Sequence, residues 1–136
     1  MYLVDTNIWL ERLLDQGRSE DVGAFLAKTS SDRLFCTDFC YHSIGVILCR
    51  LHYSGLFLMF THDLFYDGGV RLIHLGPGDM DAMVRAMEAY SLDFDDAYQY
   101  CAAQRNGLSL VSFDVDFDRT PEGRTEPDGN GMLKTV

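Results

Sequence analysis

Short apolar runs alternate with longer segments of helical periodicity along most of this chain, and this alternation constrains the fold more than any other feature. The strand-like runs occupy residues 1–4, 33–36, 70–75 and 108–112. Parallel strands need long crossover connections, which are usually helices. The pattern therefore predicts an α/β fold, specifically a three-layer α/β/α sandwich around a central, mostly parallel sheet of four to five strands.

The expected helices are delimited by residues that cap or break helices. Thr37 or Asp38 is expected to cap one of them, and Asp79 and Asp93 are expected to cap two others. The predicted helices begin near residues 8 and 19, continue from 38 to about 51, from 56 to 66 and from 80, and end with a helix from 93 to 106.

One domain is expected over residues 1–136, because no linker, repeat or low-complexity segment interrupts the pattern. From about residue 119 to 136 the chain is rich in proline, glycine and polar residues. These residues are therefore predicted to form a loop-rich tail that ends in an edge strand at 132–136.

The composition predicts a cytoplasmic protein with no membrane partner. Acids at positions 5 and 11 interrupt the apolar start, and the most apolar stretch, residues 44–60, is shorter than the ~20 residues that span a bilayer. The four cysteines form no CxxC pair, which favours a reducing compartment. A formal net charge of −10 argues against broad adhesion to nucleic acid, although not against an enzyme that acts on it.

Four acids stand where such a sheet would bring them together. Asp5 follows the first strand, Asp114 follows the last strong strand, Asp116 comes two residues later, and Asp96 lies in the first turn of a helix. Ligands of open α/β sheets bind beyond the carboxyl ends of the strands. Capping or turn formation explains each acid singly, but not their shared placement.

A cluster of carboxylates is typical of a site for Mg²⁺ or Mn²⁺, which prefer oxygen ligands. Such a cation can bind a phosphodiester and activate water. Asn7 is placed to orient Asp5, and Ser112 to orient Asp114.

The segments MYLVDTNIWLERLL and LDFDDAYQYCAAQRNGLSLVSFDVDFD, with the element order between them, resemble the PIN-domain nucleases over about residues 1–118. The resemblance implies metal-dependent hydrolysis of single-stranded RNA, and the best-known small members are ribonuclease toxins of toxin–antitoxin pairs. It also implies a possible protein antitoxin and a possible homodimer as partners. The family's acidic positions match Asp5, Asp96, Asp114 and Asp116, and Ser112 stands where the family often has threonine.

One family position is not matched. The family usually carries a glutamate in the helix after the second strand, and here that position falls near His42 or Ser43. Asp38 and His42 are four residues apart and could share a helix face, so either is a possible additional ligand. The alternative is that Asp38 caps the helix and that His42 packs against Asp38 or pairs with it.

Other interpretations stay open from the sequence alone. A catalytically weakened PIN-like module that binds RNA or a partner would also account for the missing glutamate. A zinc site of Cys36, Cys40 and His42 lacks the usual ligand spacing. The string Asp116 to Thr120 matches the D-x-D-x-T of haloacid-dehalogenase phosphatases, but it comes too late in the chain. The apolar run 56–60 is predicted to form either a partner surface or a buried helix.

Overall fold

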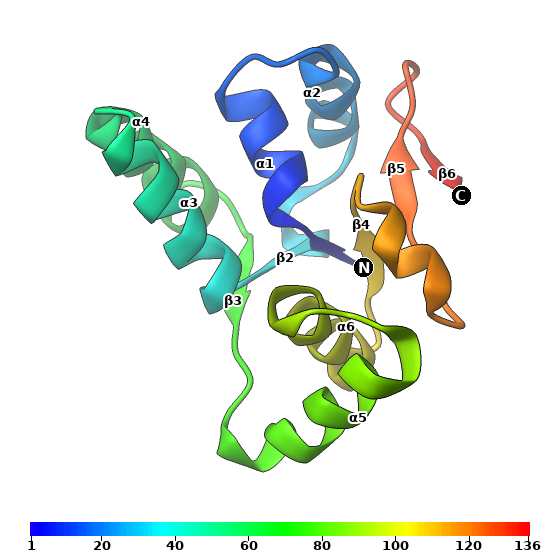
Figure 1. Cartoon of the computed structure of the whole chain (residues 1–136). Coiled ribbons are helices and arrows are strands. Elements are labelled where there is room, and N and C mark those ends of the chain that lie inside the picture. The colour runs from blue at the N-terminus through cyan, green and yellow to red at the C-terminus, as the bar shows by residue number, and fades with distance from the viewer.

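The computed structural model describes residues 1–136 and contains one six-stranded sheet of order β3-β2-β1-β4-β5-β6 (Figure 1). The first five strands pair in parallel, and β6 is antiparallel to β5. The mostly parallel α/β fold is confirmed, with one strand more than the upper number expected from the sequence. The strands are β1 (Tyr2–Val4), β2 (Leu34–Thr37), β3 (Arg71–Ile73), β4 (Ser109–Val111), β5 (Thr125–Pro127) and β6 (Leu133–Thr135).

Helices cover both faces of this sheet, as Figure 1 shows. Leu3 and Val4 are adjacent in β1 and belong to two different hydrophobic clusters, because successive side chains of a strand point to opposite faces. The α-helices are α1 (Thr6–Leu13), α2 (Ser19–Lys28), α3 (Asp38–Arg50), α4 (Ser54–Thr61), α5 (Met80–Tyr90) and α6 (Phe94–Asn106). Short helical turns add η1 (Ser31–Arg33), η2 (His62–Tyr66), η3 (Pro77–Asp79) and η4 (Val115–Arg119).

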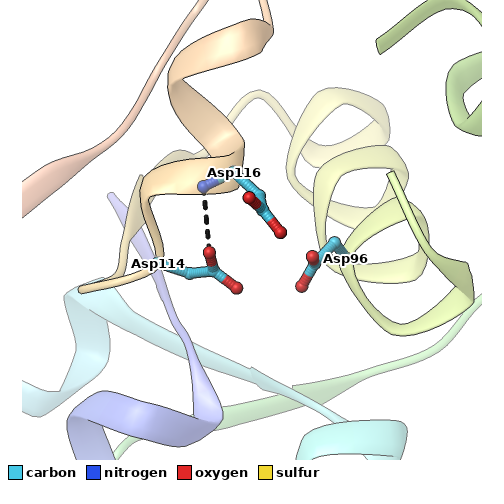
Figure 2. Close-up of side chains that lie close together, drawn as sticks. All are labelled: Asp96, Asp114 and Asp116. Atoms are coloured by element: carbon cyan, nitrogen blue, oxygen red, sulfur yellow. Dashed lines mark hydrogen bonds between the residues drawn. The ribbon is translucent and has the colours of Figure 1, made fainter. Parts of the chain in front are cut away.

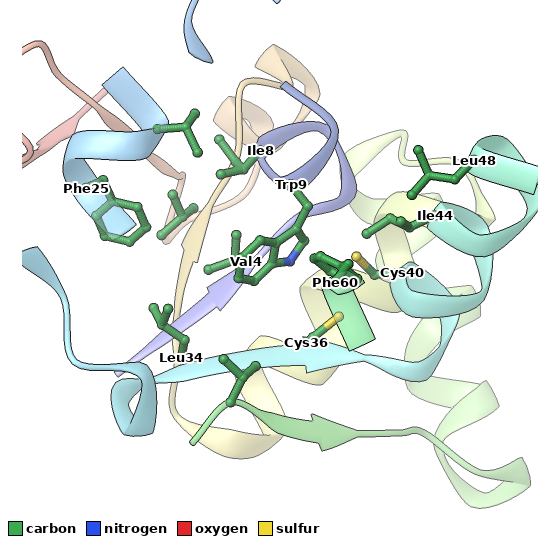
Figure 3. Packing of buried hydrophobic residues seen from close by; sticks show 13 residues of the cluster. Val4, Ile8, Trp9, Phe25, Leu34, Cys36, Cys40, Ile44, Leu48 and Phe60 are labelled. Carbon is green, nitrogen blue, oxygen red and sulfur yellow. The ribbon is translucent and has the colours of Figure 1, made fainter. Parts of the chain in front are cut away.

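The cluster on the Val4 face is formed largely by α1 to α4 and is drawn in Figure 3. Trp9 is its largest side chain and meets Phe60 of α4 edge-on, with ring centroids 5.5 Å apart. The cluster on the Leu3 face is closed by α5, α6 and Phe117 of η4. Burial of these apolar side chains supplies the main stabilisation of the three layers.

Two of the expected helix caps are present, and the third is not. Thr37 caps α3 by accepting the Cys40 amide hydrogen at 3.0 Å, and Asp93 caps α6 by accepting from Asp96 N at 3.1 Å. Asp79 precedes α5 but makes no capping bond to it. Its carboxylate instead accepts from the Gly76 amide and pairs with Arg105, because η3 turns the chain before the helix begins.

The tail was predicted as loop apart from its edge strand, and this is wrong for β5. The expected edge strand is present as β6, but it pairs with β5, and Thr125 of β5 pairs in turn with Val111 of β4. The buried Arg124 guanidinium explains why the segment is ordered. It donates hydrogen bonds to Asp118, to Glu126 and to the Ser112 carbonyl.

The apolar run 56–60 lies in α4, where Phe60 is buried but Leu58 and Met59 are 60 % and 61 % exposed. The run is therefore only partly buried in the domain, and a partner surface on its exposed side stays a prediction. None of the helices has the length and apolar character that crossing a bilayer requires.

Candidate metal centre and adjoining cleft

Three carboxylates converge at the carboxyl end of the sheet. Oxygens of Asp96, Asp114 and Asp116 all lie within 4.8 Å of one another (Figure 2). Asp96 comes from the first turn of α6, Asp114 from the chain just after β4, and Asp116 from η4. The sheet topology brings β1 beside β4, so Asp5 at the end of β1 belongs to the same edge.

Local turns hold the two C-terminal carboxylates. Asp114 caps η4 by accepting the Asp116 amide hydrogen at 2.9 Å, the bond drawn in Figure 2. Arg119 Nη1 pairs with Asp116 Oδ1 at 3.1 Å, and its guanidinium also donates to the Tyr90 and Ser91 carbonyls. The guanidinium is therefore fixed to the backbone at the α5–α6 connection, on the side of Asp116.

Asp5 lines a cleft of about 330 Å³ together with Asp96 and Asp114 of the carboxylate group. It is buried and stands outside the closely spaced group of three. Asp5 Oδ1 accepts from Thr6 N at 2.8 Å and from Gln99 Nε2 at 3.0 Å, and Oδ2 accepts from Ser112 Oγ at 2.7 Å and Asn7 Nδ2 at 3.4 Å. These four donors occupy most of the acceptor capacity of one carboxylate.

Asn7 and Ser112 connect the acids, as expected, although Ser112 does so differently from the prediction. Its hydroxyl orients Asp5 directly and accepts the backbone N–H of Asp114 at 3.0 Å. Asn7 donates to Ser112 Oγ at 3.1 Å and accepts from Phe113 N at 3.1 Å. Ser112 therefore positions the Asp114 backbone rather than its carboxylate.

Gln99 was not identified from the sequence. It is buried on α6, donates to Asp5 and accepts from the Thr37 hydroxyl at 2.6 Å. Its place three residues after Asp96 on a helix is the signal that could have revealed it, because residues at that spacing share a helix face.

Burial, together with the neighbouring like charges, raises the proton affinity of the site. Burial, followed by the charges of Asp114, Asp93 and Asp5, raises the pKa of Asp96 to about 7. Burial also raises the pKa of Asp5 above its ordinary value, against the lowering effect of its hydrogen bonds from Ser112, Thr6 and Gln99. A divalent cation would relieve this repulsion, and three clustered carboxylates are the hard oxygen donors that Mg²⁺ and Mn²⁺ prefer. The residues therefore fit such a cation.

Asp38 and His42 do not line this cleft. They line a neighbouring pocket, and the residues of α3 that reach the cleft are Phe39, Ser43 and Ile47. Asp38 Oδ1 accepts from Phe39 N at 2.8 Å and from the Tyr98 hydroxyl at 2.7 Å. Burial raises the pKa of Tyr98 to about 12, so this hydroxyl keeps its proton and donates. A ligand role for Asp38 or His42 stays a prediction.

The structure gives no support to the two other sites considered. Cys36 and Cys40 are buried in the hydrophobic core, whereas His42 is exposed, and the three do not form a group with metal-ligand spacing. The D-x-D-x-T string lies in η4 rather than at a strand end, and its Asp118 pairs with Arg124 at 3.0 Å.

The model of the PIN-domain family matches residues 2–123. The chain belongs to the PIN-domain family. No curated protein sequence matches the chain significantly.

Solved PIN-domain structures share the fold at low sequence identity. A toxin–antitoxin complex from Klebsiella pneumoniae is 22 % identical with a TM-score of 0.70, covering 90 % of this chain and 94 % of that one. VapC20 of Mycobacterium tuberculosis, a toxin that cleaves the Sarcin-Ricin loop, is 15 % identical with a TM-score of 0.73 over 87 % and 93 % of the two chains. FitAcB from Neisseria gonorrhoeae is 17 % identical with a TM-score of 0.67, covering 95 % and 98 %. At these identities the likeness establishes the fold.

Proposed function

We propose that this PIN-domain protein is an endoribonuclease that depends on Mg²⁺ or Mn²⁺ and hydrolyses phosphodiester bonds of single-stranded RNA. The observation that carries the proposal is the convergence of Asp96, Asp114 and Asp116 within 4.8 Å at the carboxyl end of a PIN-type sheet. Without a counter-charge these acids would repel a phosphate, and a bound cation removes that obstacle.

Asp96, Asp114 and Asp116 would hold the cation, and Asp5 would face it from the buried end of the cleft. A bound divalent cation lowers the pKa of water and stabilises charge on the phosphate oxygens. Burial and the neighbouring carboxylates raise the pKa of Asp96 to about 7, so near neutral pH the free protein would carry this carboxyl partly protonated, and a bound cation would favour its ionised form.

The surrounding residues position these groups. Ser112, Asn7 and Gln99 fix the Asp5 carboxylate, and the Ser112 hydroxyl also holds the Asp114 backbone. Ligand geometry maintained in this way requires little rearrangement when substrate arrives.

The deciding experiment compares RNA cleavage in Mn²⁺ by the native chain, Asp96→Asn and Asp114→Asn. Asp81→Asn is the matched control, because Asp81 is an exposed acid of α5 outside the cleft. Both cleft substitutions should abolish cleavage while the control keeps it. Unchanged cleavage in both would contradict the proposal, and Mn²⁺ binding without cleavage by the native chain would support the alternative of a binding module.

A protein antitoxin is the partner that we propose for this nuclease, in a cytoplasmic toxin–antitoxin pair. The K. pneumoniae neighbour is a toxin–antitoxin complex, and here α4 exposes Leu58 and Met59 in a chain of net charge −10. A basic antitoxin with an apolar segment suits such a surface. Where a small gene adjoins the gene for this chain, co-expression of its product should yield a complex that Leu58→Glu disrupts. If Leu58 instead lies in a homodimer interface, Leu58→Glu should dissociate the protein when it is expressed alone.

A further inference from the structure

A second pocket lies beside the carboxylate cleft, across one face of α3. It has a volume of about 590 Å³ and shares Phe39, Ser43 and Ile47 with the cleft. These three residues are spaced four apart, so they project from one face of the helix. A single row of side chains therefore separates the two hollows.

Aromatic rings line this pocket. The Phe39 ring centroid lies 5.2 Å from that of Tyr98 and 6.0 Å from that of Phe94. Phe94 is 46 % exposed and stands two residues before Asp96 at the start of α6. Exposed aromatic faces are the surfaces on which unstacked bases of single-stranded RNA bind.

Polar groups in the same pocket lack partners within the protein. Asp38 Oδ1 is engaged by Phe39 N and the Tyr98 hydroxyl, but Oδ2 receives no hydrogen bond from the chain. The Ser43 hydroxyl and the His42 imidazole, which also line the pocket, make none either. An apolar side chain docked here would leave these groups buried and unpaired, which is costly. A nucleobase brings an aromatic face and hydrogen-bonding edges together.

We infer that this pocket binds the base of a nucleotide whose phosphate occupies the carboxylate cleft, with preference for a base that carries an exocyclic amino group. The inference rests on the proposed function, because it takes RNA as the substrate. A carboxylate oxygen accepts hydrogen bonds, so Asp38 Oδ2 suits the exocyclic amino group of cytosine, adenine or guanine. Uracil has a carbonyl oxygen where cytosine has that amino group. This oxygen is an acceptor, so it would face the Asp38 acceptor without a hydrogen bond between them.

The test uses mononucleotides, which contain no internucleotide bond to cleave. The full chain is titrated in Mg²⁺ with cytidine 5′-monophosphate, uridine 5′-monophosphate and ribose 5-phosphate, and binding is followed by calorimetry or NMR shifts. Cytidine monophosphate should bind most tightly, and Phe94→Ala should weaken it about tenfold. Tyr66→Ala, which removes an aromatic ring that is 74 % exposed elsewhere on the surface, should leave the affinity unchanged.

Asp38→Asn probes the base preference with little risk to folding. The asparagine carbonyl can still accept from Phe39 N and the Tyr98 hydroxyl, while its amide nitrogen replaces the free carboxylate oxygen. The cytidine and uridine nucleotides should then bind with similar affinity. Retention of the native preference by Asp38→Asn would contradict the proposed readout.

Other outcomes separate this inference from the proposed nuclease activity. Equal affinity for ribose 5-phosphate and cytidine monophosphate would overturn the inference of a base pocket, since the base would then make no contact with the protein. The base-pocket inference would also be overturned if Phe94→Ala changed the sedimentation coefficient but not the nucleotide affinity. That result would mean that the pocket is covered by a second copy of the chain rather than by a base. A native chain that cleaves no RNA yet keeps the cytidine preference would contradict the nuclease and support the base pocket.

Discussion

The side-chain amide of Gln99 donates a 3.0 Å hydrogen bond to Asp5 Oδ1, joining two residues that lie 94 positions apart in the sequence. The Gln99 carbonyl accepts from Thr37 at 2.6 Å, so one buried amide connects the ends of β1 and β2 to α6. The orientation of Asp5 therefore depends on the docking of α6 against the sheet.

Replacement of Gln99 by leucine should lower the free energy of unfolding by about 1–3 kcal/mol, because the Thr37 hydroxyl loses its acceptor and Asp5 loses a donor in a buried setting. Urea unfolding with an unchanged m-value measures the loss. Gln104→Leu, an exposed change on the same helix, should stay within about 0.5 kcal/mol of the native chain. Equal stability of the two variants would show that the Gln99 hydrogen bonds contribute little.

In the metal-free protein, the free energy of unfolding should depend on pH, and Asp96 should account for part of this dependence. Its folded-state pKa of about 7 lies above the ordinary value of 3.8, so between these values the folded protein holds more protons than the unfolded chain. The unfolding free energy should therefore fall as the pH rises through this window. Urea titrations in EDTA at pH 5 and pH 7.5 should show a smaller decrease for Asp96→Asn than for Asp81→Asn, and identical decreases would contradict the assignment to Asp96.

The positions of the acids could be predicted from sequence because the parallel topology itself determines them. Asp5 and Asp114 follow β1 and β4, which are neighbours in the sheet, and the residues after paired parallel strands lie at one edge. The cap at Asp93 then places Asp96 in the first turn of α6, facing that edge. Short-range rules were sufficient for these residues.

The features that the sequence did not reveal depend on contacts between distant residues. β5 has only three residues and includes a proline, so its local pattern predicts a loop. Its order comes from the buried Arg124 and from Glu126, which also pairs with Arg18 at 3.1 Å. The separation of Asp38 from the cleft likewise depends on Tyr98, whose hydroxyl holds the Asp38 carboxylate in the adjoining pocket.

Arg124→Met should therefore destabilise the protein by about 3 kcal/mol, because the Ser112 carbonyl, Asp118 and Glu126 lose a buried cationic donor together. Thermal and urea unfolding measure the loss. Arg85→Met, on the exposed side of α5, is the matched control and should change stability by less than about 0.5 kcal/mol. Addition of Glu126→Gln to Arg124→Met should cost less than the sum of the two single changes, since the two groups interact directly. Strict additivity would contradict this coupling.

Ser112 offers the sharpest test of how the cleft is positioned. Its hydroxyl donates to Asp5 at 2.7 Å and accepts from the Asp114 backbone at 3.0 Å, without itself lining the cleft. Ser112→Ala should weaken Mn²⁺ binding by about 10- to 100-fold, as loss of an orienting hydrogen bond does at other metal sites. Ser112→Thr should restore most of the affinity, because it returns the hydroxyl. Calorimetric titration with Mn²⁺ measures both variants, and urea unfolding of the metal-free proteins separates positioning from folding. If Ser112→Thr bound Mn²⁺ as weakly as Ser112→Ala, the packing around residue 112, rather than its hydroxyl, would control the site.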